Sequence, residues 1–159
     1  MWHTTMVKTT EQSKLLNTEY QLISARSDIA PAMGVAIDTK VLQSWVDALG
    51  ERASEFLVNI IGSYFEDAAK LLQAMAAAVV EGDAYALEYQ AHTLKSSSAA
   101  LGATILPKLC QSLESMGRTG VIAEATEFVS QICMEYERVK AALQKELQYH
   151  QAQLAKALK

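Results

Sequence analysis

Glycine and proline are scarce in this sequence of 159 residues, which contains 7 Gly and 2 Pro. An all-β fold needs these residues at its many turns, so their scarcity argues strongly against that class. Long apolar runs are also missing. The longest one spans residues 74–80, far short of the roughly 20 residues that a membrane-spanning helix needs. We therefore expect neither an all-β protein nor a membrane protein.

Cysteine and positive charge are equally limited. Cys110 and Cys133 lie in apolar helical patterns and form no Cys-x-x-Cys pair, so we expect reduced core residues rather than a zinc site or a disulfide. The formal charge of -4 and the lack of a basic stripe argue against nucleic-acid binding. The first residues lack the apolar region of a secretory signal, and no nucleotide-binding glycine motif is present. These absences favour a cytoplasmic protein.

Alanine and leucine are abundant, with 25 Ala and 18 Leu. Both have high helix propensity, and from residue 38 onward the apolar positions recur with a period near 3.6. The pattern predicts a short helix over 38–49, long helices over 51–81 and 83–101, a helix over 104–117 and a last helix from 120. The predicted fold is therefore all-α: an antiparallel four-helix bundle with a short N-terminal capping helix and an extended last helix.

The chain divides by composition into three segments. Residues 1–34 are rich in Thr, Ser, Gln and Asn, and we interpret them as a polar N-terminal arm or linker. Residues 35–146 carry the bundle pattern. In residues 147–159, Gln, Lys and His dominate, and we interpret this segment as a polar helical tail that includes His150.

Small and polar residues set the predicted helix ends. Asp83 follows Gly82 and is a suitable N-cap for the helix over 83–101. Thr104 is the predicted N-cap of the following helix. Gly117 is predicted to end that helix, and Gly120 to open the last one.

Histidine is the residue type with the most chemical interest. Three are present: His3, His92 and His150. The first lies in the polar arm and the third in the polar tail. On its predicted helix, His92 shares a face with Lys95 and Ser96, and Glu88 lies one turn earlier on the same side. The apolar positions of that helix point elsewhere, so we expect an exposed imidazole. Such a group is a competent nucleophile near neutral pH, and a nearby ammonium attracts an anion such as phosphate.

Two local strings strengthen this interpretation. Residues 91–103 read A-H-T-L-K-S-S-S-A-A-L-G-A, and residues 109–114 read L-C-Q-S-L-E. They resemble the His-x-Leu-Lys-Gly-Ser-Ser-x-x-Leu-Gly-Ala and Leu-Cys-x-x-Leu-Glu motifs of histidine-containing phosphotransfer (Hpt) domains. The resemblance covers about residues 36–145. It implies a helical bundle that carries a phosphoryl group on a histidine.

The resemblance implies a role for each residue at a motif position. His92 would be the phospho-acceptor, Lys95 would stabilise the phosphoryl charge, Glu114 would orient the imidazole, and Ser97 would be structural. Ser96 departs from the family pattern, which usually has Gly beside the imidazole. Its hydroxyl could crowd an approaching partner or donate a hydrogen bond to the phosphoryl oxygens, so we expect slower or more selective transfer.

The resemblance also implies the partners. In the family, the histidine takes a phosphoryl group from an aspartyl phosphate of one receiver domain and passes it to an Asp of another. The expected partners are therefore the receiver domains of a hybrid histidine kinase and of a response regulator, with no nucleic acid and no membrane. The carrier needs no metal or cofactor of its own, because the receivers bring Mg²⁺. We expect a monomer that is not an enzyme, since it is itself modified at each step.

Other interpretations stay open. The bundle could be a phosphotransfer-inactive adaptor or scaffold that binds receiver or kinase domains, and Ser96 is the residue that favours this reading. Leucines at near-heptad spacing, which reach Leu158, could pair the last helix with another helix. Glu88 and His92 could contribute to a metal site, although no second histidine lies on a core helix. The chain could also be a fragment of a hybrid sensor kinase.

Overall fold

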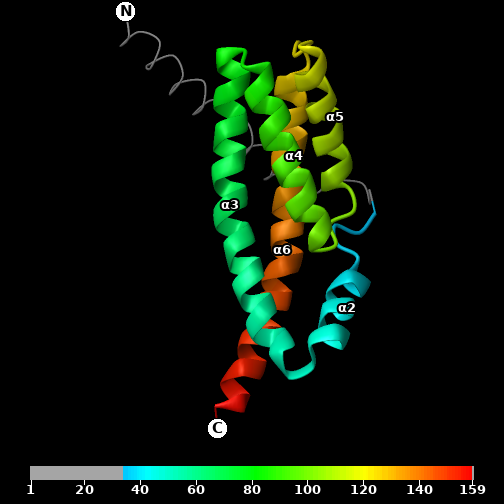
Figure 1. Cartoon of the computed structure of the whole chain (residues 1–159), viewed down its shortest axis with the longest axis vertical. Helices are drawn as coiled ribbons and strands as arrows, with labels where there is room; N and C mark the ends of the chain where they lie inside the picture. Colours follow the sequence, from blue (N-terminus) through cyan, green and yellow to red (C-terminus); the bar gives the residue numbers. More distant parts are fainter. Residues whose placement is uncertain (1–33, 159) are drawn as a thin grey trace, which may run out of the picture.

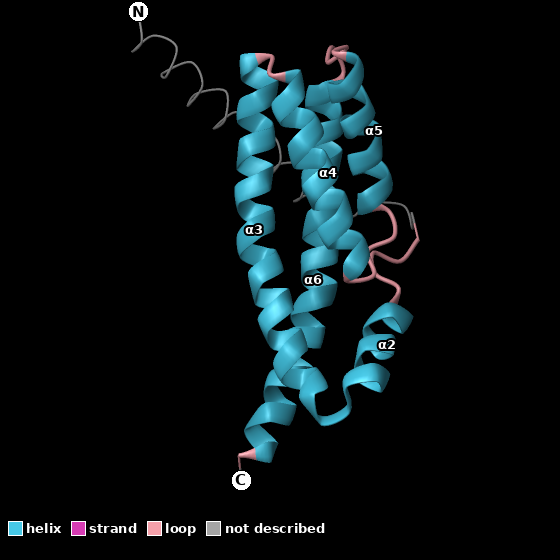
Figure 2. Ribbon diagram, in the orientation of Figure 1, coloured by secondary structure: helices cyan, strands magenta, loops and turns pink. Residues whose placement is uncertain are grey.

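The structure is a computed structural model that describes residues 34–158. Its helices are α2 (Thr39–Leu49), the short 3-10 helix η2 (Gly50–Arg52), α3 (Ala53–Glu81), α4 (Ala84–Ala100), α5 (Leu106–Thr119) and α6 (Ala125–Ala157). Helices α3 to α6 form a bundle, and α2 lies beside one end of it (Figures 1 and 2). The predicted all-α bundle with a short N-terminal helix and an extended last helix is confirmed. The proposed polar arm over 1–34 lies, except for its last residue, outside the described residues.

The four long helices are arranged in a ring. α3 packs against α4 and α6, and α5 packs against the same two helices. Successive helices run in opposite directions, so the α3–α4 turn and the α5–α6 connection lie at the same end (Figure 1). Each helix contributes fully buried leucines to one core, among them Leu57, Leu87, Leu113 and Leu143. Burying one such side chain stabilises the fold by about 2 kcal/mol. The 3.6-residue period seen in the sequence is the spacing of these core positions.

A close backbone contact attaches the start of α2 to the bundle. The N–H of Asp38 donates to the carbonyl of Gly102, with an N···O distance of 2.8 Å. Gly102 has a φ of +92°, and a Cβ at this position would lie 2.6 Å from the Asp38 carbonyl oxygen. Only glycine accepts both constraints. Further along α2, Trp45 lies against Phe56 of α3, with ring centroids 5.3 Å apart.

The predicted boundary between the last two helices is wrong. Gly117 does not end α5 but lies inside it and is buried. The helix continues to Thr119 and ends at Gly120, whose φ of +76° gives the left-handed C-cap that glycine favours. The chain then forms a short connection, and α6 begins at Ala125 rather than at Gly120.

The N-terminal caps agree with the sequence at α4 and differ at α5. Asp83 caps α4 as predicted, because its carboxylate accepts from the N–H of Ala86 at 3.0 Å. Thr104 does not cap α5: the N-cap is Ile105, and the Thr104 hydroxyl donates instead to the carbonyl of Val35. Within residues 34–158, no helix is long and apolar enough to cross a membrane.

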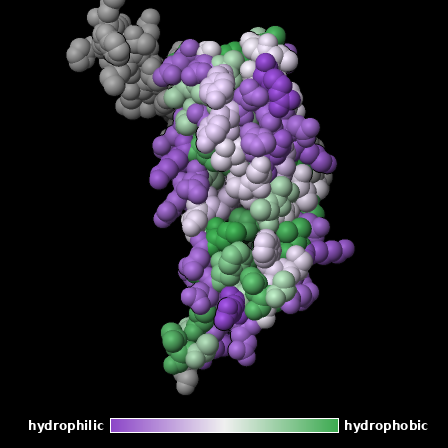
Figure 3. Space-filling model, viewed as in Figure 1, coloured by the Kyte–Doolittle hydropathy of each residue, from purple (hydrophilic) through white to green (hydrophobic). Residues whose placement is uncertain are grey.

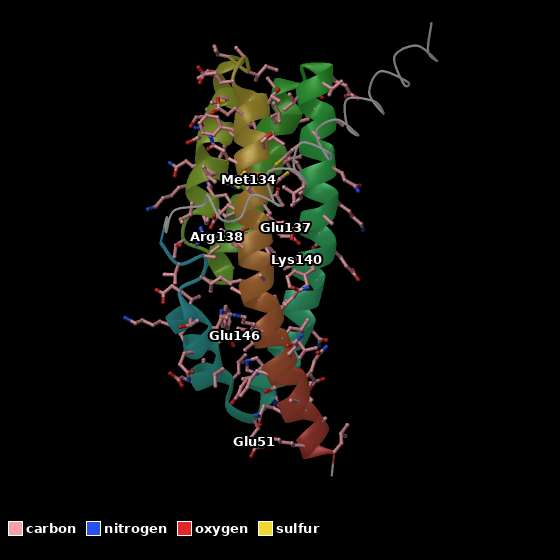
Figure 4. The ribbon with its side chains drawn as sticks, turned by 180° about the vertical axis from the view of Figure 1, so that it is seen from behind. Glu51, Met134, Glu137, Arg138, Lys140 and Glu146 are labelled. Carbon is pink, nitrogen blue, oxygen red and sulfur yellow. The ribbon has the colours of Figure 1, made fainter. Side chains whose placement is uncertain are left out.

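His150 lies in a different environment from the polar tail that the sequence suggested. Its residue exposure is only 3%, and its Nδ1 lies 2.9 Å from the Ser54 hydroxyl at the start of α3. The reason is spacing, since His150 continues the apolar seam of α6 three residues after Leu147. A cavity of about 970 Å³ between α2, the start of α3 and this part of α6 includes Ser54, Glu146 and His150 in its lining. Figure 4 shows Glu146 on α6, across from α2.

Candidate functional site

Helix α4 presents His92 on its outer face. The side chain is 60% exposed, whereas Leu87 and Leu94 of the same helix are fully buried. The imidazole Nδ1 lies 3.0 Å from Oε1 of Glu114, a residue of the neighbouring helix α5. Because Nδ1 is held by the carboxylate, Nε2 is the ring nitrogen that remains available to another molecule. The exposure expected from the helical spacing is therefore observed.

Glu114 is the most enclosed member of the site, with a side chain only 8% exposed. Lys95 donates from Nζ to Oε2 at 2.6 Å, and Arg118 donates from Nη2 to Oε1 at 3.1 Å. The hydrogen bond from Lys95, followed by that from His92, holds the pKa of the Glu114 carboxyl below its usual value of 4.5, although burial acts in the opposite direction. Glu114 is therefore a carboxylate at neutral pH and acts as the common partner of three basic side chains.

Arg118 is the member of the site that the sequence analysis missed. Besides Glu114, it contacts Glu88 of α4, with 3.2 Å between its Nε and Oε1. Its spacing of four residues from Glu114 was a usable signal, because such pairs face each other on a helix. Together, Lys95, Arg118, Glu88 and Glu114 form a cluster of two positive and two negative charges beside the imidazole.

A close approach of α4 and α5 makes these contacts possible. Gly117 lies where the two helices meet, and a Cβ there would lie 2.6 Å from the Ala84 carbonyl oxygen and from the Glu88 nitrogen. Both distances are far below van der Waals contact, so a larger residue would push the helices apart. Glu114 lies one turn before Gly117 on α5. The absent side chain of Gly117 thus allows Glu114 to reach His92.

The three serines that follow the motif lysine have different environments. The Ser96 hydroxyl is exposed and donates to the carbonyl of His92 at 3.1 Å, so its proton is directed to the helix backbone. Ser97 is half-buried and donates to the carbonyl of Leu94 at 3.3 Å. Ser98 is fully buried, and its hydroxyl lies 2.7 Å from that of Tyr64 on α3. Only Ser96 lies on the same exposed face as the imidazole.

The other candidate groups supply neither a second nucleophile nor a metal site. Both cysteines are free thiols, and burial raises the pKa of Cys110 to about 12 and that of Cys133 to about 11. Thiols in this state are poor nucleophiles. Within the described range of 34–158, no group of three or more His, Cys, Asp or Glu side chains could hold a metal ion. Glu88, considered as a partner of His92 in such a site, pairs with Arg118 instead.

Comparison with known proteins agrees with the motif. The family model of the Hpt domain matches residues 59–155, which include His92, Lys95 and Glu114. Among solved structures, the chain is similar to the crystal structure of histidine-containing phosphotransfer protein B (HptB) from Pseudomonas aeruginosa PAO1. The two share 27% sequence identity with a TM-score of 0.65, over 72% of this chain and 96% of the other. No curated protein matches the sequence. Since the family model matches more than half of its residues, the chain belongs to the Hpt domain family.

Proposed function

We propose that this Hpt domain is a phosphocarrier in a multistep two-component phosphorelay. His92 takes a phosphoryl group from the aspartyl phosphate of one receiver domain and passes it to an Asp of another. The observation that carries the proposal is the exposed imidazole whose Nδ1 is held 3.0 Å from a buried carboxylate on the next helix. This arrangement fixes the ring and leaves one nitrogen free.

The geometry supports a specific transfer step. When His92 donates its Nδ1–H to Glu114, the lone pair of the neutral ring lies on Nε2. Nε2 attacks the phosphorus, an N–P bond forms, and the P–O bond to the aspartate breaks, so the carboxylate leaves with the electron pair. The ring keeps its Nδ1 proton and gains positive charge, which the Glu114 carboxylate stabilises. Donation is the reverse step, with the carboxylate of a second receiver as the nucleophile.

Lys95 supplies the positive charge for the incoming group. Its Nζ lies 2.6 Å from Glu114, which places an ammonium beside the imidazole. The step needs charge neutralisation and positioning more than covalent chemistry from the carrier. The Mg²⁺ would come with the receiver domain, and the carrier would use no cofactor of its own. On this proposal the chain acts in the cytoplasm as a monomer, with receivers of a hybrid kinase and of a response regulator as partners.

Ser96 modifies the site through its size. Compared with the glycine usual in the family, serine adds a CH₂OH group. Its hydroxyl is hydrogen-bonded to the His92 carbonyl, so this group lies against the helix, one turn beyond the imidazole. A receiver that docks on this face must accommodate them. We expect Ser96→Gly to change the rate of transfer or the choice of receiver, and unchanged rates with every receiver would contradict this role.

A small phosphoryl donor tests the proposal without any partner protein. Wild type and His92→Gln are incubated with phosphoramidate, and the product is followed by intact mass. We expect wild type to gain one phosphoryl group that is labile to acid and stable to alkali, and we expect the variant, with an unchanged circular dichroism spectrum, to gain none. Ser96→Gly runs alongside, to show whether the serine limits access. If neither wild type nor Ser96→Gly is phosphorylated, the adaptor function is favoured and the carrier function is wrong.

A further inference from the structure

The cavity at the α2 end of the bundle lies apart from His92. It has a volume of about 970 Å³ and is lined by residues of α2, η2, the start of α3 and the last turns of α6. Pockets that hold small organic molecules in proteins have volumes of about 300–1,000 Å³. Figure 3 shows hydrophobic side chains at this lower end of the molecule, with hydrophilic ones among them. The cavity is therefore large enough, and mixed enough in polarity, for a small organic ligand.

His150 is the most enclosed polar side chain in the lining, with a residue exposure of 3%. Its Nδ1 lies 2.9 Å from the Ser54 hydroxyl, so one ring nitrogen has a hydrogen-bond partner. Its Nε2 has none within residues 34–158, because Oε2 of Glu146 is 3.9 Å away, too far for a hydrogen bond. In the tautomer whose Nδ1–H donates to Ser54, Nε2 presents a lone pair. The imidazole and the carboxylate are then two neighbouring acceptors, and a group with several N–H donors satisfies both.

The charges of the lining favour a cation as the donor group. Glu146 of α6 and Glu51 of η2 are the two acidic side chains of the cavity, and Figure 4 shows both at this end of the molecule. Lys40, which is exposed, is the single lysine or arginine in the lining. In the part of the chain that the structure describes, the Glu146 carboxylate pairs with no lysine or arginine. An ammonium beside it forms a charge-assisted hydrogen bond, which is stronger than a bond between neutral groups.

The apolar part of the lining indicates the body of the ligand. Aliphatic side chains of α2 and α6 line the cavity: Leu42, Val46, Leu154 and Ala157. An alkyl chain that covers them leaves water and gains binding free energy in proportion to the apolar area buried. We infer that the cavity binds a small aliphatic amine, with its ammonium between His150 and Glu146 and its alkyl chain against the aliphatic side chains of α2 and α6. This site is separate from the proposed carrier function.

Three probes that share one alkyl chain and differ in the head group test the proposal: hexylamine, 1-hexanol and hexanoate. Each is titrated into the full chain, and the imidazole signals of His150 are followed by NMR. These signals are assigned by comparison with His3→Gln and His92→Gln. Glu146→Gln removes the carboxylate at nearly unchanged size. Glu137→Gln is the matched control, because Glu137 is exposed on the same helix and does not line the cavity.

We expect hexylamine to shift the His150 signals and to saturate at millimolar concentrations, and we expect 1-hexanol and hexanoate to bind about tenfold or more weakly. Glu146→Gln should lose about the same factor for hexylamine, whereas Glu137→Gln should match wild type.

Equal affinity of wild type for hexylamine and 1-hexanol would overturn the ammonium site, and so would the absence of any shift. Equal hexylamine affinity in Glu146→Gln and wild type would also overturn it. The comparison of the three probes needs only wild type, so it decides the question even if a variant unfolds. None of these outcomes bears on the carrier function, which the phosphoramidate reaction of His92 tests separately.

Discussion

At the scale of single residues, Glu114 is the common partner of the three basic side chains around the proposed acceptor site. It accepts from the imidazole of His92, from the ammonium of Lys95 and from the guanidinium of Arg118. A buried carboxylate is costly unless such partners compensate its lost hydration. In the proposed transfer step, the carboxylate held by these partners would also be a fixed counter-ion for the positive charge on the imidazole. One residue therefore combines a stabilising role with a positioning role.

Replacing Glu114 should make the free energy of unfolding vary less with pH in the acid range. Its pKa is held below 4.5 in the folded state, so its ionisation stabilises the protein fully above about that pH. This contribution is lost as the pH falls through the lowered folded-state value. We expect Glu114→Gln to lower the free energy of unfolding by about 1–2 kcal/mol at pH 7. We expect this difference to shrink as the pH falls below 4.5 and through the lowered folded-state pKa of Glu114. Urea titrations of both proteins across this range measure the difference, and a constant difference at every pH would contradict the assignment.

The sequence reveals these residues unequally. The grouping of His92 with Glu114 followed from motifs on two separate segments, and the structure brings them together. Arg118 was missed because a sequence motif records only residue types at fixed positions. The contact between Arg118 and Glu88 depends instead on how closely α4 and α5 pack. His150 was misplaced because its polar neighbours in sequence outweighed its helical spacing of three residues from Leu147. Both errors concern polar residues whose burial is decided by packing between helices.

At the scale of helices, the contact between α4 and α5 determines the site. Gly117→Ala would place a Cβ 2.6 Å from backbone atoms of α4. Overpacking of this kind costs about 1–3 kcal/mol, against roughly 1 kcal/mol gained from better helix propensity. We therefore expect a net loss of stability of up to about 2 kcal/mol and slower phosphorylation of His92. Chemical denaturation and the phosphoramidate reaction measure the two effects.

Gly62 offers a matched control for this prediction. It also lies inside a long helix, α3, but a Cβ there would meet nothing within 4 Å. Gly62→Ala should stabilise the protein by about 0.5–1 kcal/mol and leave phosphorylation unchanged. If both alanine variants were stabilised to the same extent, the close packing at Gly117 would not be the feature that positions Glu114.

The helix bodies were predictable, whereas both ends of α5 and the start of α6 were not. Apolar periodicity reports which face of a helix is buried, and it placed the cores of α3, α4 and α6 correctly. A glycine in such a pattern has two meanings, since it either ends a helix or allows another helix to come close. Gly120 has the first role and Gly117 has the second. The sequence around Gly117 contains no signal that separates the two roles, because the backbone atoms that approach Gly117 belong to α4.

At the scale of the whole molecule, the proposed acceptor His92 lies on an open surface. The cavity of about 970 Å³ is lined by residues of α2, η2, α3 and α6 and by none of α4 or α5, so it is separate from His92. A nucleophile on an exposed helix face is accessible to another protein, which can bring its own pocket and metal. The exposed position of His92 on α4 therefore suits the proposed exchange of a phosphoryl group between protein domains.

The most direct test of this account is to determine which imidazole nitrogen of His92 carries the phosphoryl group. Nδ1 lies 3.0 Å from Glu114, so only Nε2 is free to react. The protein is labelled with ¹⁵N, phosphorylated with phosphoramidate, and examined by ³¹P and ¹⁵N NMR at alkaline pH. The account predicts a single phosphohistidine at His92 with phosphorus bonded to Nε2. A phosphoryl group on Nδ1, or on any residue other than His92, would contradict it.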